Sequence, residues 1–195
     1  MDYAVTNWLF AVFGESEFLL SFFKIVTYLG EWWSICIIIA TLIAFKKTRK
    51  IGFFAGVSVL LAFSFNNCFL KMVIKRERPF VAFEEFGGAC KVAGYVFPTG
   101  YSMASGHATA SMALCASVFL QSKKSGLIFL WFPVLIGFSR MILCVHYLTD
   151  VLVGWFIGIC FSIISFLLIN FLKKLYLKGK GENYEKINFS NKEQA

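Results

Sequence analysis

The 195-residue chain has little charge and little proline. Charged residues make up 15% of it and only 3 residues are proline, whereas 58% are hydrophobic and 24 are phenylalanine. This apolar content lies well above that of soluble domains. The composition therefore argues against a soluble or disordered protein and predicts one that resides in a membrane. The length suits a single domain.

Signals of several other protein classes are absent from the sequence. No Cys-x2-Cys pair and no Cys/His spacing typical of a zinc site occurs. The net charge of +8 comes without a basic stripe interleaved with aromatic residues, so nucleic acid is not an expected partner. Cys68 and Cys90 could form a disulfide, but their spacing in the sequence does not favour one.

Apolar runs predict an all-α, polytopic bundle of membrane helices. Uncharged runs of 20 and 22 residues can each cross a hydrocarbon core, which needs about 20 helical residues. Shorter runs become spans if their polar ends lie at the watery rim of the membrane. Five spans are therefore expected, at 32–45, 51–70, 108–122, 125–139 and 151–172.

The two ends of the chain differ from this pattern. Three charged residues interrupt the stretch 3–30, which is compatible with a sixth span or with an interfacial helical hairpin. This stretch lacks the basic start of a secretory signal peptide, so cleavage is not expected. We assign residues 1–178 to the membrane domain. The polar tail, 179–195, has no apolar periodicity and is predicted to be disordered and cytoplasmic.

Lysine and arginine clusters orient the spans. Clusters at 46–50, 123–124 and 173–180 fall on one side if the spans alternate, and the positive-inside rule makes that side cytoplasmic. The other side receives the segment 72–104 and the turn that holds His146. Charges that violate the bias in a membrane protein commonly serve a function. Here they are Lys71, Lys75, Arg76, Arg78 and Arg140.

A polar cluster near residue 146 suits phosphate chemistry. His146 and Asp150 are four residues apart and share one face if they are helical. The carboxylate can then fix the tautomer of the imidazole and leave its other nitrogen as base or nucleophile. Arg140, six residues before the histidine, can direct its guanidinium at phosphate oxygens. The alternative is an interfacial salt-bridge group that locks two helices together.

A second cluster, Ser105-Gly106-His107, follows a glycine-containing loop and opens a helix. Helix-start amides, a hydroxyl and a glycine that permits close approach together make an anion site. The alternative is ordinary N-capping by Ser105, with His107 facing lipid headgroups.

The third cluster, Lys71-x6-Arg78-Pro79, follows the outer end of a span. Taken alone, it is also typical of a basic segment that binds lipid headgroups. However, all three clusters converge on one membrane face and contain every histidine of the chain. A shared phosphate site is therefore favoured over three separate structural roles.

In order and spacing the three clusters resemble the signature of the type 2 phosphatidic acid phosphatase family. That family includes membrane lipid phosphatases and, more distantly, vanadium-dependent haloperoxidases. The resemblance covers Lys71 to Asp150, and it departs at Ala104, where the family commonly has proline before Ser-Gly-His. We expect Ala104→Pro to preserve or raise activity. The opposite is expected if the Ala104 amide donates a hydrogen bond that proline removes.

The resemblance implies a role for each motif residue. His146 attacks phosphorus and forms a phosphohistidine, and Asp150 orients it. His107 protonates the leaving oxygen and then activates water. The phosphoryl oxygens are held by Lys71, Arg78, Ser105, Gly106 and Arg140.

Neither a metal nor another cofactor is expected. Three fixed cations can offset the charge of a five-coordinate phosphorus. Only two carboxylates, Glu77 and Asp150, lie in or beside the motifs, which is too few for a two-metal centre.

A site at the outer rim of an apolar bundle favours a substrate with its phosphate among headgroups and its tail in lipid. The family resemblance implies undecaprenyl diphosphate, phosphatidylglycerophosphate, phosphatidate or lipid A phosphates, and the first two rank first. The expected partners are this lipid and the bilayer of the cell membrane, and nothing in the sequence specifies an oligomeric state. The alternative is a non-hydrolytic lipid-phosphate binder or flippase, which needs Lys71, Arg78 and Arg140 but not His146.

Overall fold

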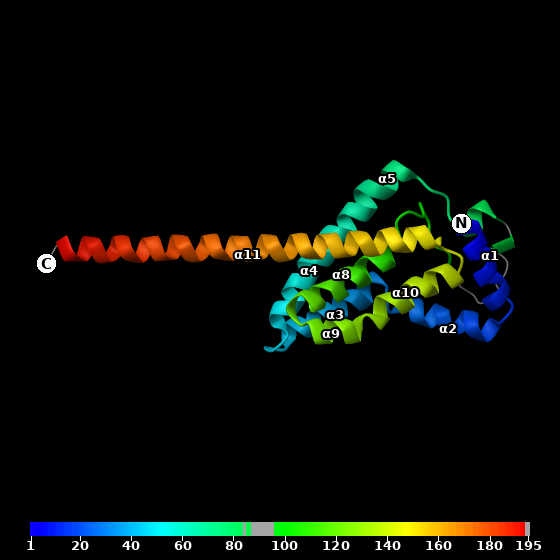
Figure 1. The fold of residues 1–195 in the computed structure, drawn as a ribbon, viewed down its shortest axis with the longest axis horizontal. Helices are drawn as coiled ribbons and strands as arrows, with labels where there is room; N and C mark the ends of the chain where they lie inside the picture. The colour runs from blue at the N-terminus through cyan, green and yellow to red at the C-terminus, as the bar shows by residue number, and fades with distance from the viewer. Residues whose placement is uncertain (84, 87–95, 194–195) are drawn as a thin grey trace.

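The computed structural model describes residues 1–83, 85–86 and 96–193, of which 181–193 are described by their backbone alone. This part of the chain consists of helices and loops without a strand, as the sequence predicts. The helices form an elongated bundle, and the last of them extends far beyond it (Figure 1).

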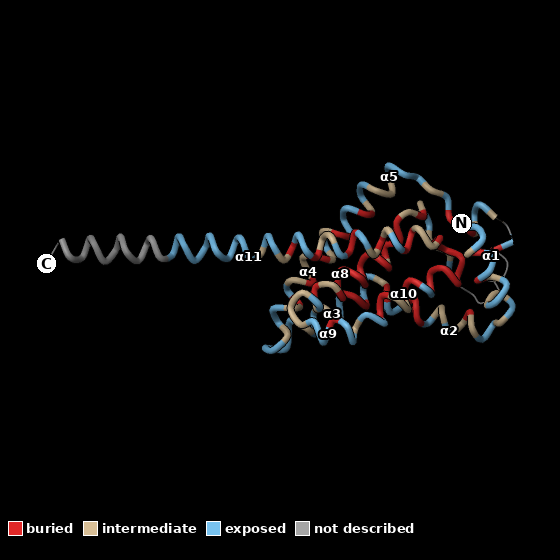
Figure 2. The backbone as a smooth tube through the Cα atoms, in the orientation of Figure 1, coloured by how far each residue is buried: buried red, intermediate tan, exposed pale blue. Residues whose placement is uncertain are grey.

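Helix α8 (Gly106–Gln121) forms the centre of the bundle. The helices that pack around it include α3 (Trp32–Ala44), α4 (Arg49–Ser64), α10 (Trp131–Ile142) and α11 (Leu148–Glu193). Figure 2 shows that the backbone of α8 is largely buried. Half of its 16 residues are Gly, Ala, Ser or Thr, and such small side chains let neighbouring helix backbones approach closely.

Small residues on α11 fit against α8. A Cβ added at Gly154 or Gly158 would lie 2.9 or 2.7 Å from backbone carbonyl oxygens at the start of α8. One turn further along, the Ser162 hydroxyl donates a hydrogen bond to Ala113 O at 2.8 Å. Residues four apart share one helix face, so α11 packs on α8 through this face. This packing brings the first turns of the two helices together.

Three helical stretches are long and apolar enough to cross a membrane within the described residues: Arg49–Ala82, Lys123–Ile142 and Leu148–Lys180. A fourth results if α2 (Glu17–Tyr28) and α3, which bend by 49° at their junction, act as one span. Helix α8 rises only about 24 Å, short of a core of about 30 Å. All five predicted spans are helical, and their number as membrane crossings remains a prediction.

The first 30 residues form two short helices. Helix α1 (Asp2–Phe13) and α2 are joined at Gly14, and Ser16 caps α2 by accepting a hydrogen bond from Leu19 N–H at 3.4 Å. Each helix has 12 residues and rises about 18 Å. Neither is long enough to cross the hydrocarbon core alone. The two arrangements that the sequence leaves open, a sixth span and an interfacial hairpin, both remain predictions.

The basic loops and the polar motifs lie at opposite ends of the bundle. Figure 1 shows the α3–α4 connection and the junction of α8 with α9 (Lys123–Phe129) at one end, and the start of α11 at the other. Alternating helices produce this separation, as the sequence predicts.

The last helix reaches the end of the described residues. Helix α11 is described to Glu193, and the disorder and the cytoplasmic position expected for residues 179–195 remain predictions. Cys90, one half of the optional disulfide, lies outside the described residues.

Candidate active site

The reversal of the chain between α10 and α11 brings the motif residues together. Arg140 lies in the last turn of α10 and Asp150 in the first turn of α11. The N–H groups of Val145 and His146 both donate to Arg140 O, at 3.2 and 3.3 Å. Ser105 N–H donates to Asp150 O at 3.0 Å. Backbone hydrogen bonds thus fix the turn and tie it to the start of α8.

His146 is enclosed, with 2% of its surface exposed. Its Nε2 lies 3.1 Å from Arg78 Nη1, and because a guanidinium only donates, Nε2 is the nitrogen without a proton. Burial lowers the pKa of His146 well below its usual value. The neighbouring cations of Arg78, Arg140 and Lys71 lower this pKa further. The imidazole is therefore neutral at neutral pH, as a nucleophile must be.

Asp150 supports His146 through an intermediate hydroxyl. Ser102 Oγ lies 3.3 Å from His146 Nδ1 and donates a short hydrogen bond to Asp150 Oδ2. The direct separation of Nδ1 and Oδ2 is 3.5 Å, at the outer limit of hydrogen-bond geometry. The sequence predicts a direct contact, and the structure adds Ser102, which no motif spacing singles out.

The second oxygen of Asp150 is bound by an arginine from a different element. Arg76 Nη1 donates to Asp150 Oδ1 at 2.8 Å, and its Nη2 donates to Asp2 Oδ2 at 2.6 Å. Asp2 also accepts from the N–H and hydroxyl of Thr149, at 3.2 and 2.6 Å. One interpretation of the sequence groups Arg140 with this carboxylate, whereas Arg76 is the arginine that pairs with it. The N-terminal helix thereby contributes to the support of the site.

Arg78 and Arg140 are both anchored by the protein. Arg78 donates from Nε to Gly100 O and from Nη1 to Val145 O, each at 2.9 Å. Arg140, 1% exposed, donates from Nη1 to Thr27 Oγ1 at 2.8 Å. Cations held in this way beside an imidazole need little reorganisation to stabilise negative charge.

The start of α8 supplies a hydroxyl and the second histidine. Ser105 is the residue at the N-cap, yet its side chain makes no capping hydrogen bond. Its Oγ is buried and has no hydrogen-bond partner among the described residues. The expectation of ordinary capping by this side chain is therefore wrong. His107 Nε2 lies 3.2 Å from Glu31 Oε1.

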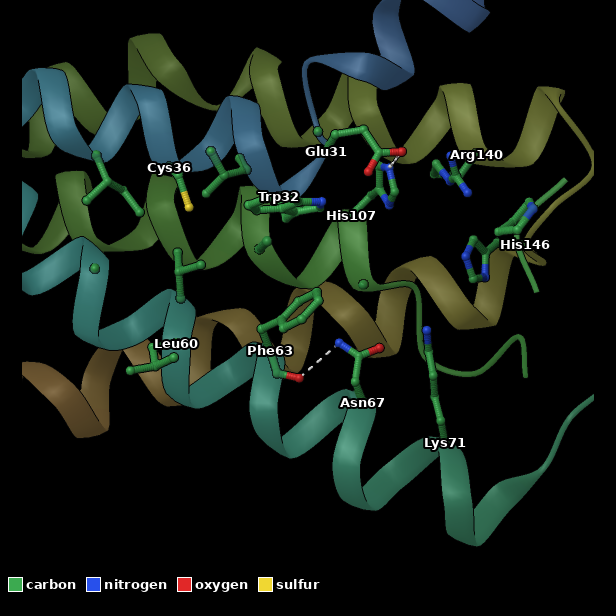
Figure 3. Close-up of a pocket in the computed structure, with 18 of the residues that line it drawn as sticks. Glu31, Trp32, Cys36, Leu60, Phe63, Asn67, Lys71, His107, Arg140 and His146 are labelled. Atoms are coloured by element: carbon green, nitrogen blue, oxygen red, sulfur yellow. Dashed lines mark hydrogen bonds and ion pairs between the residues drawn. The ribbon is translucent and has the colours of Figure 1, made fainter. Parts of the chain in front are cut away.

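A cavity of about 800 Å³ opens between α3, α4 and α8. Figure 3 shows Lys71, His107, Arg140 and His146 around one end of it. The six predicted site residues that line this end are Lys71, Arg78, Gly106, His107, Arg140 and His146. Most of the remaining lining is apolar and includes Ile35, Ile39, Ile43, Val59, Leu60 and Phe63. Of the predicted set, Ser105 and Asp150 lie behind this wall and bind each other through their backbones.

The residue that replaces the family's proline is held by a side chain. Asn66, fully buried in the π-helical turn η1 (Phe65–Leu70), accepts from Ala104 N–H at 3.2 Å. It also donates from Nδ2 to Ala104 O at 3.1 Å. These two bonds fix the backbone just before Ser105. Turns of this kind are frequent at functional sites.

Five residues of this arrangement were missed by the sequence-based analysis: Asp2, Glu31, Asn66, Arg76 and Ser102. Two of them carried a usable signal, because Asn66 lies within an apolar run and Glu31 directly precedes one. Arg76 lies in the basic cluster already noted. No local pattern marks Asp2 or Ser102. In the described ranges, up to 83, 85–86 and from 96, no group of three His, Cys, Asp or Glu side chains is placed to hold a metal ion.

Comparison with known sequences identifies relatives of the central region. The model of the PAP2 superfamily matches residues 51–174. An undecaprenyl-diphosphatase of Sulfolobus acidocaldarius is 32% identical over 134 residues, which cover 65% of this chain and 59% of that protein. The chain thus spans about three fifths of the length of this curated relative.

Two crystal structures share the fold. LpxE of Aquifex aeolicus superposes with a TM-score of 0.62 at 24% identity, over 82% of this chain and 93% of that one. A transmembrane PAP2-type phosphatidylglycerolphosphate phosphatase of Bacillus subtilis superposes with a TM-score of 0.66 at 23% identity, over 87% and 84%. At these identities the likeness establishes the common helical arrangement.

Proposed function

This chain belongs to the PAP2 superfamily, and on that premise we propose that it hydrolyses a lipid phosphate or diphosphate through a phosphohistidine on His146. The cavity is the observation that carries the proposal. Its polar end gathers three cations and both histidines, and the rest of it is mostly apolar. A phosphate attached to a hydrocarbon tail matches both parts, because ligand pockets pair apolar walls with a few directed polar groups.

In the first half of the reaction, the lone pair on Nε2 of His146 attacks phosphorus. The bond to the leaving oxygen breaks, and His107 donates a proton to that oxygen. The charge that develops on the equatorial oxygens is offset by Lys71, Arg78 and Arg140. The positive charge on the phosphorylated imidazole is stabilised by Asp150 through Ser102.

In the second half, water attacks the phosphohistidine. The now neutral His107 takes a proton from this water as its oxygen bonds to phosphorus. The nitrogen–phosphorus bond breaks, His146 recovers its lone pair, and phosphate leaves. His107 and water supply the protons, and amino-acid side chains supply the stabilising charges, so we propose that the reaction needs no metal.

We propose undecaprenyl diphosphate and phosphatidylglycerophosphate as the first candidate substrates, followed by phosphatidate and lipid A phosphates. The two relatives named by substrate act on an undecaprenyl diphosphate and on a phosphatidylglycerolphosphate, which supports this order. The apolar lining contributed by α3 and α4 would accommodate the lipid tail.

The active site is proposed to face the extracytoplasmic side of the cell membrane. The basic loops at the far end of the bundle support this orientation. A single cysteine at Val96, on an otherwise cysteine-free background, should react with an impermeant maleimide in intact cells. A cysteine at Lys124 should react only after lysis. Both positions are exposed, and the reverse labelling pattern would contradict the orientation.

Phosphate release from purified protein tests the function directly. Wild type and His146→Ala are incubated in EDTA with micelles of each candidate lipid. Release by wild type alone is expected. Tight lipid binding without any release would favour a binder or flippase, and a loss in EDTA that Mg²⁺ reverses would reject the metal-free mechanism.

A further inference from the structure

A carboxylate from the N-terminal region lies against the second histidine of the site. Glu31 is the residue before α3, at the 49° bend between α2 and α3. Its Oε1 lies 3.2 Å from His107 Nε2, as an ion pair that does not meet the geometry of a hydrogen bond in this structure. Figure 3 shows the two side chains facing each other. Glu31 lies outside the segment that matches the superfamily.

The bend between α2 and α3 packs closely against His107. A Cβ added at Gly30 would lie 3.1 Å from His107 Cδ2 and 2.8 Å from Ile136 Cγ2, so only glycine allows this approach. The Ser34 hydroxyl donates to Tyr28 O at 2.7 Å across the bend. The position of the Glu31 backbone is therefore fixed by packing and hydrogen bonding on both sides.

The charge of Glu31 is unusual for its location. Among the described residues that line the cavity it is the only carboxylate, and Lys71, Arg78 and Arg140 line the same space. A carboxylate repels a phosphate, so this group weakens anion binding unless it serves the chemistry. His107 is its partner in the structure.

We propose that Glu31 is the positioning carboxylate of His107. It accepts a hydrogen bond from Nε2–H and leaves Nδ1 to exchange a proton with the leaving oxygen and then with water. The inference rests on the proposed function and adds a partner for the proton donor. Each histidine then has its own carboxylate, Glu31 for His107 and Asp150 for His146.

The proton balance gives Glu31 a defined task. His107 must begin the reaction with protons on both nitrogens, and the cations Lys71, Arg78 and Arg140 oppose that charged form. The adjacent carboxylate offsets part of this repulsion. When Nδ1 gives its proton to the leaving oxygen, Nε2–H stays with Glu31, and Nδ1 is ready to accept a proton from water. Glu31 remains ionised throughout.

The test compares two single-chain phosphate monoesters of matched length. Dodecyl phosphate leaves as an alkoxide, which needs a proton, whereas an alkylated nitrophenyl phosphate leaves as a stable phenolate. Glu31→Gln should lower kcat/KM for dodecyl phosphate by roughly 10-fold to 100-fold, because general acid catalysis contributes at least this much. For the nitrophenyl ester kcat/KM should fall only a few-fold, since kcat/KM reports the step in which the leaving group departs and not the later attack of water. Glu15→Gln, an exposed carboxylate of the same region, should leave both rates unchanged.

Equal losses on the two substrates, or no loss on either, would overturn the proposal. A wild-type enzyme that hydrolyses neither ester nor any lipid of the panel would instead reject the proposed function. If Glu31→Gln does not fold, Glu31→Asp keeps the charge one methylene further away and should show the same substrate difference, more weakly. An Asp variant that loses both activities equally would also count against the proposal.

A double-mutant cycle provides a second readout. On a His107→Ala background, Glu31→Gln should cause no further loss for the nitrophenyl ester, because Glu31 acts through the histidine. A structural role for Glu31 predicts additive losses, and additivity would contradict the assignment.

Discussion

The two histidines of the site have contrasting surroundings. His146 is almost fully enclosed and is bound by Arg78 and Ser102, both from the segment that matches the superfamily. His107 keeps 18% of its side chain exposed at the cavity, and its carboxylate partner comes from residue 31, outside that segment. The difference suits their proposed tasks. A nucleophile needs one lone pair held in place, whereas a proton donor must reach both a leaving oxygen and water.

Removing the enclosed histidine should have the largest effect. We expect His146→Ala to lower kcat by roughly 10³-fold or more on every substrate, because loss of a nucleophile removes the covalent pathway. His107→Ala should lower kcat/KM far more for dodecyl phosphate than for the nitrophenyl ester. Acid-labile phosphoenzyme should accumulate in His107→Ala with the nitrophenyl ester and be absent from His146→Ala. Normal phosphate release by His146→Ala would remove the assigned nucleophile.

The sequence predicts more of the first environment than of the second. Arg140, His146 and Asp150 lie within one short segment, so their spacing along two helix ends predicts that they converge. Contacts made by residues outside the three motifs escaped prediction. Glu31 comes close to His107 because α1 and α2 pack on α10. Local periodicity does not encode such packing.

Local sequence patterns also fail to predict the hydrogen bonds that hold the loop before Ser105 and the number of membrane-spanning helices. Asn66 and Ala104 are 38 residues apart, and the proline rule that motivates Ala104→Pro concerns the local backbone alone. The sequence alone also does not determine how many helices cross the membrane. Apolar runs predict helices well, but whether a short helix such as α8 crosses a membrane depends on how its ends meet water.

Ala104→Pro should now have an intermediate effect, opposite to the first expectation from the sequence. The Ala104 amide donates to Asn66 Oδ1 at 3.2 Å, in a buried setting. Proline removes this donor and leaves the acceptor unsatisfied, which costs about 1–3 kcal/mol. We expect kcat/KM to fall about tenfold, since 1.4 kcal/mol corresponds to about a factor of ten.

Ala104→Gly is the matched control for this variant, because it keeps the amide and removes only the methyl group. It should retain most of the activity. Asn66→Leu should reproduce the loss seen in Ala104→Pro. Full activity of Ala104→Pro at normal yield would show that the hydrogen bond does not hold the loop that carries His107.

The smallest effect is expected at Asp2, which supports the enclosed histidine from the N-terminal helix. Burial raises the pKa of Asp2, but hydrogen bonds from Thr149 and Arg76 outweigh it, and the pKa lies below its ordinary value of 3.8. The folded state therefore binds fewer protons than the unfolded state in this range, and stability increases with pH. The contribution of Asp2 is complete above about pH 4 and is lost as the pH falls through the lowered pKa.

Asp2→Asn should consequently lower the apparent melting temperature most at neutral pH. The pair with Arg76 is partly exposed and screened by solvent, so we expect about 1 kcal/mol or less, or roughly 2–4 °C. Thermal unfolding in detergent between pH 3 and 7 measures the difference, with Glu15→Gln as the control for an exposed carboxylate. The gap between wild type and Asp2→Asn should narrow below about pH 4. If the difference in melting temperature instead increases on acidification, Asp2 is protonated in the folded protein. The N-terminal helix then does not hold Arg76 against Asp150 through charge.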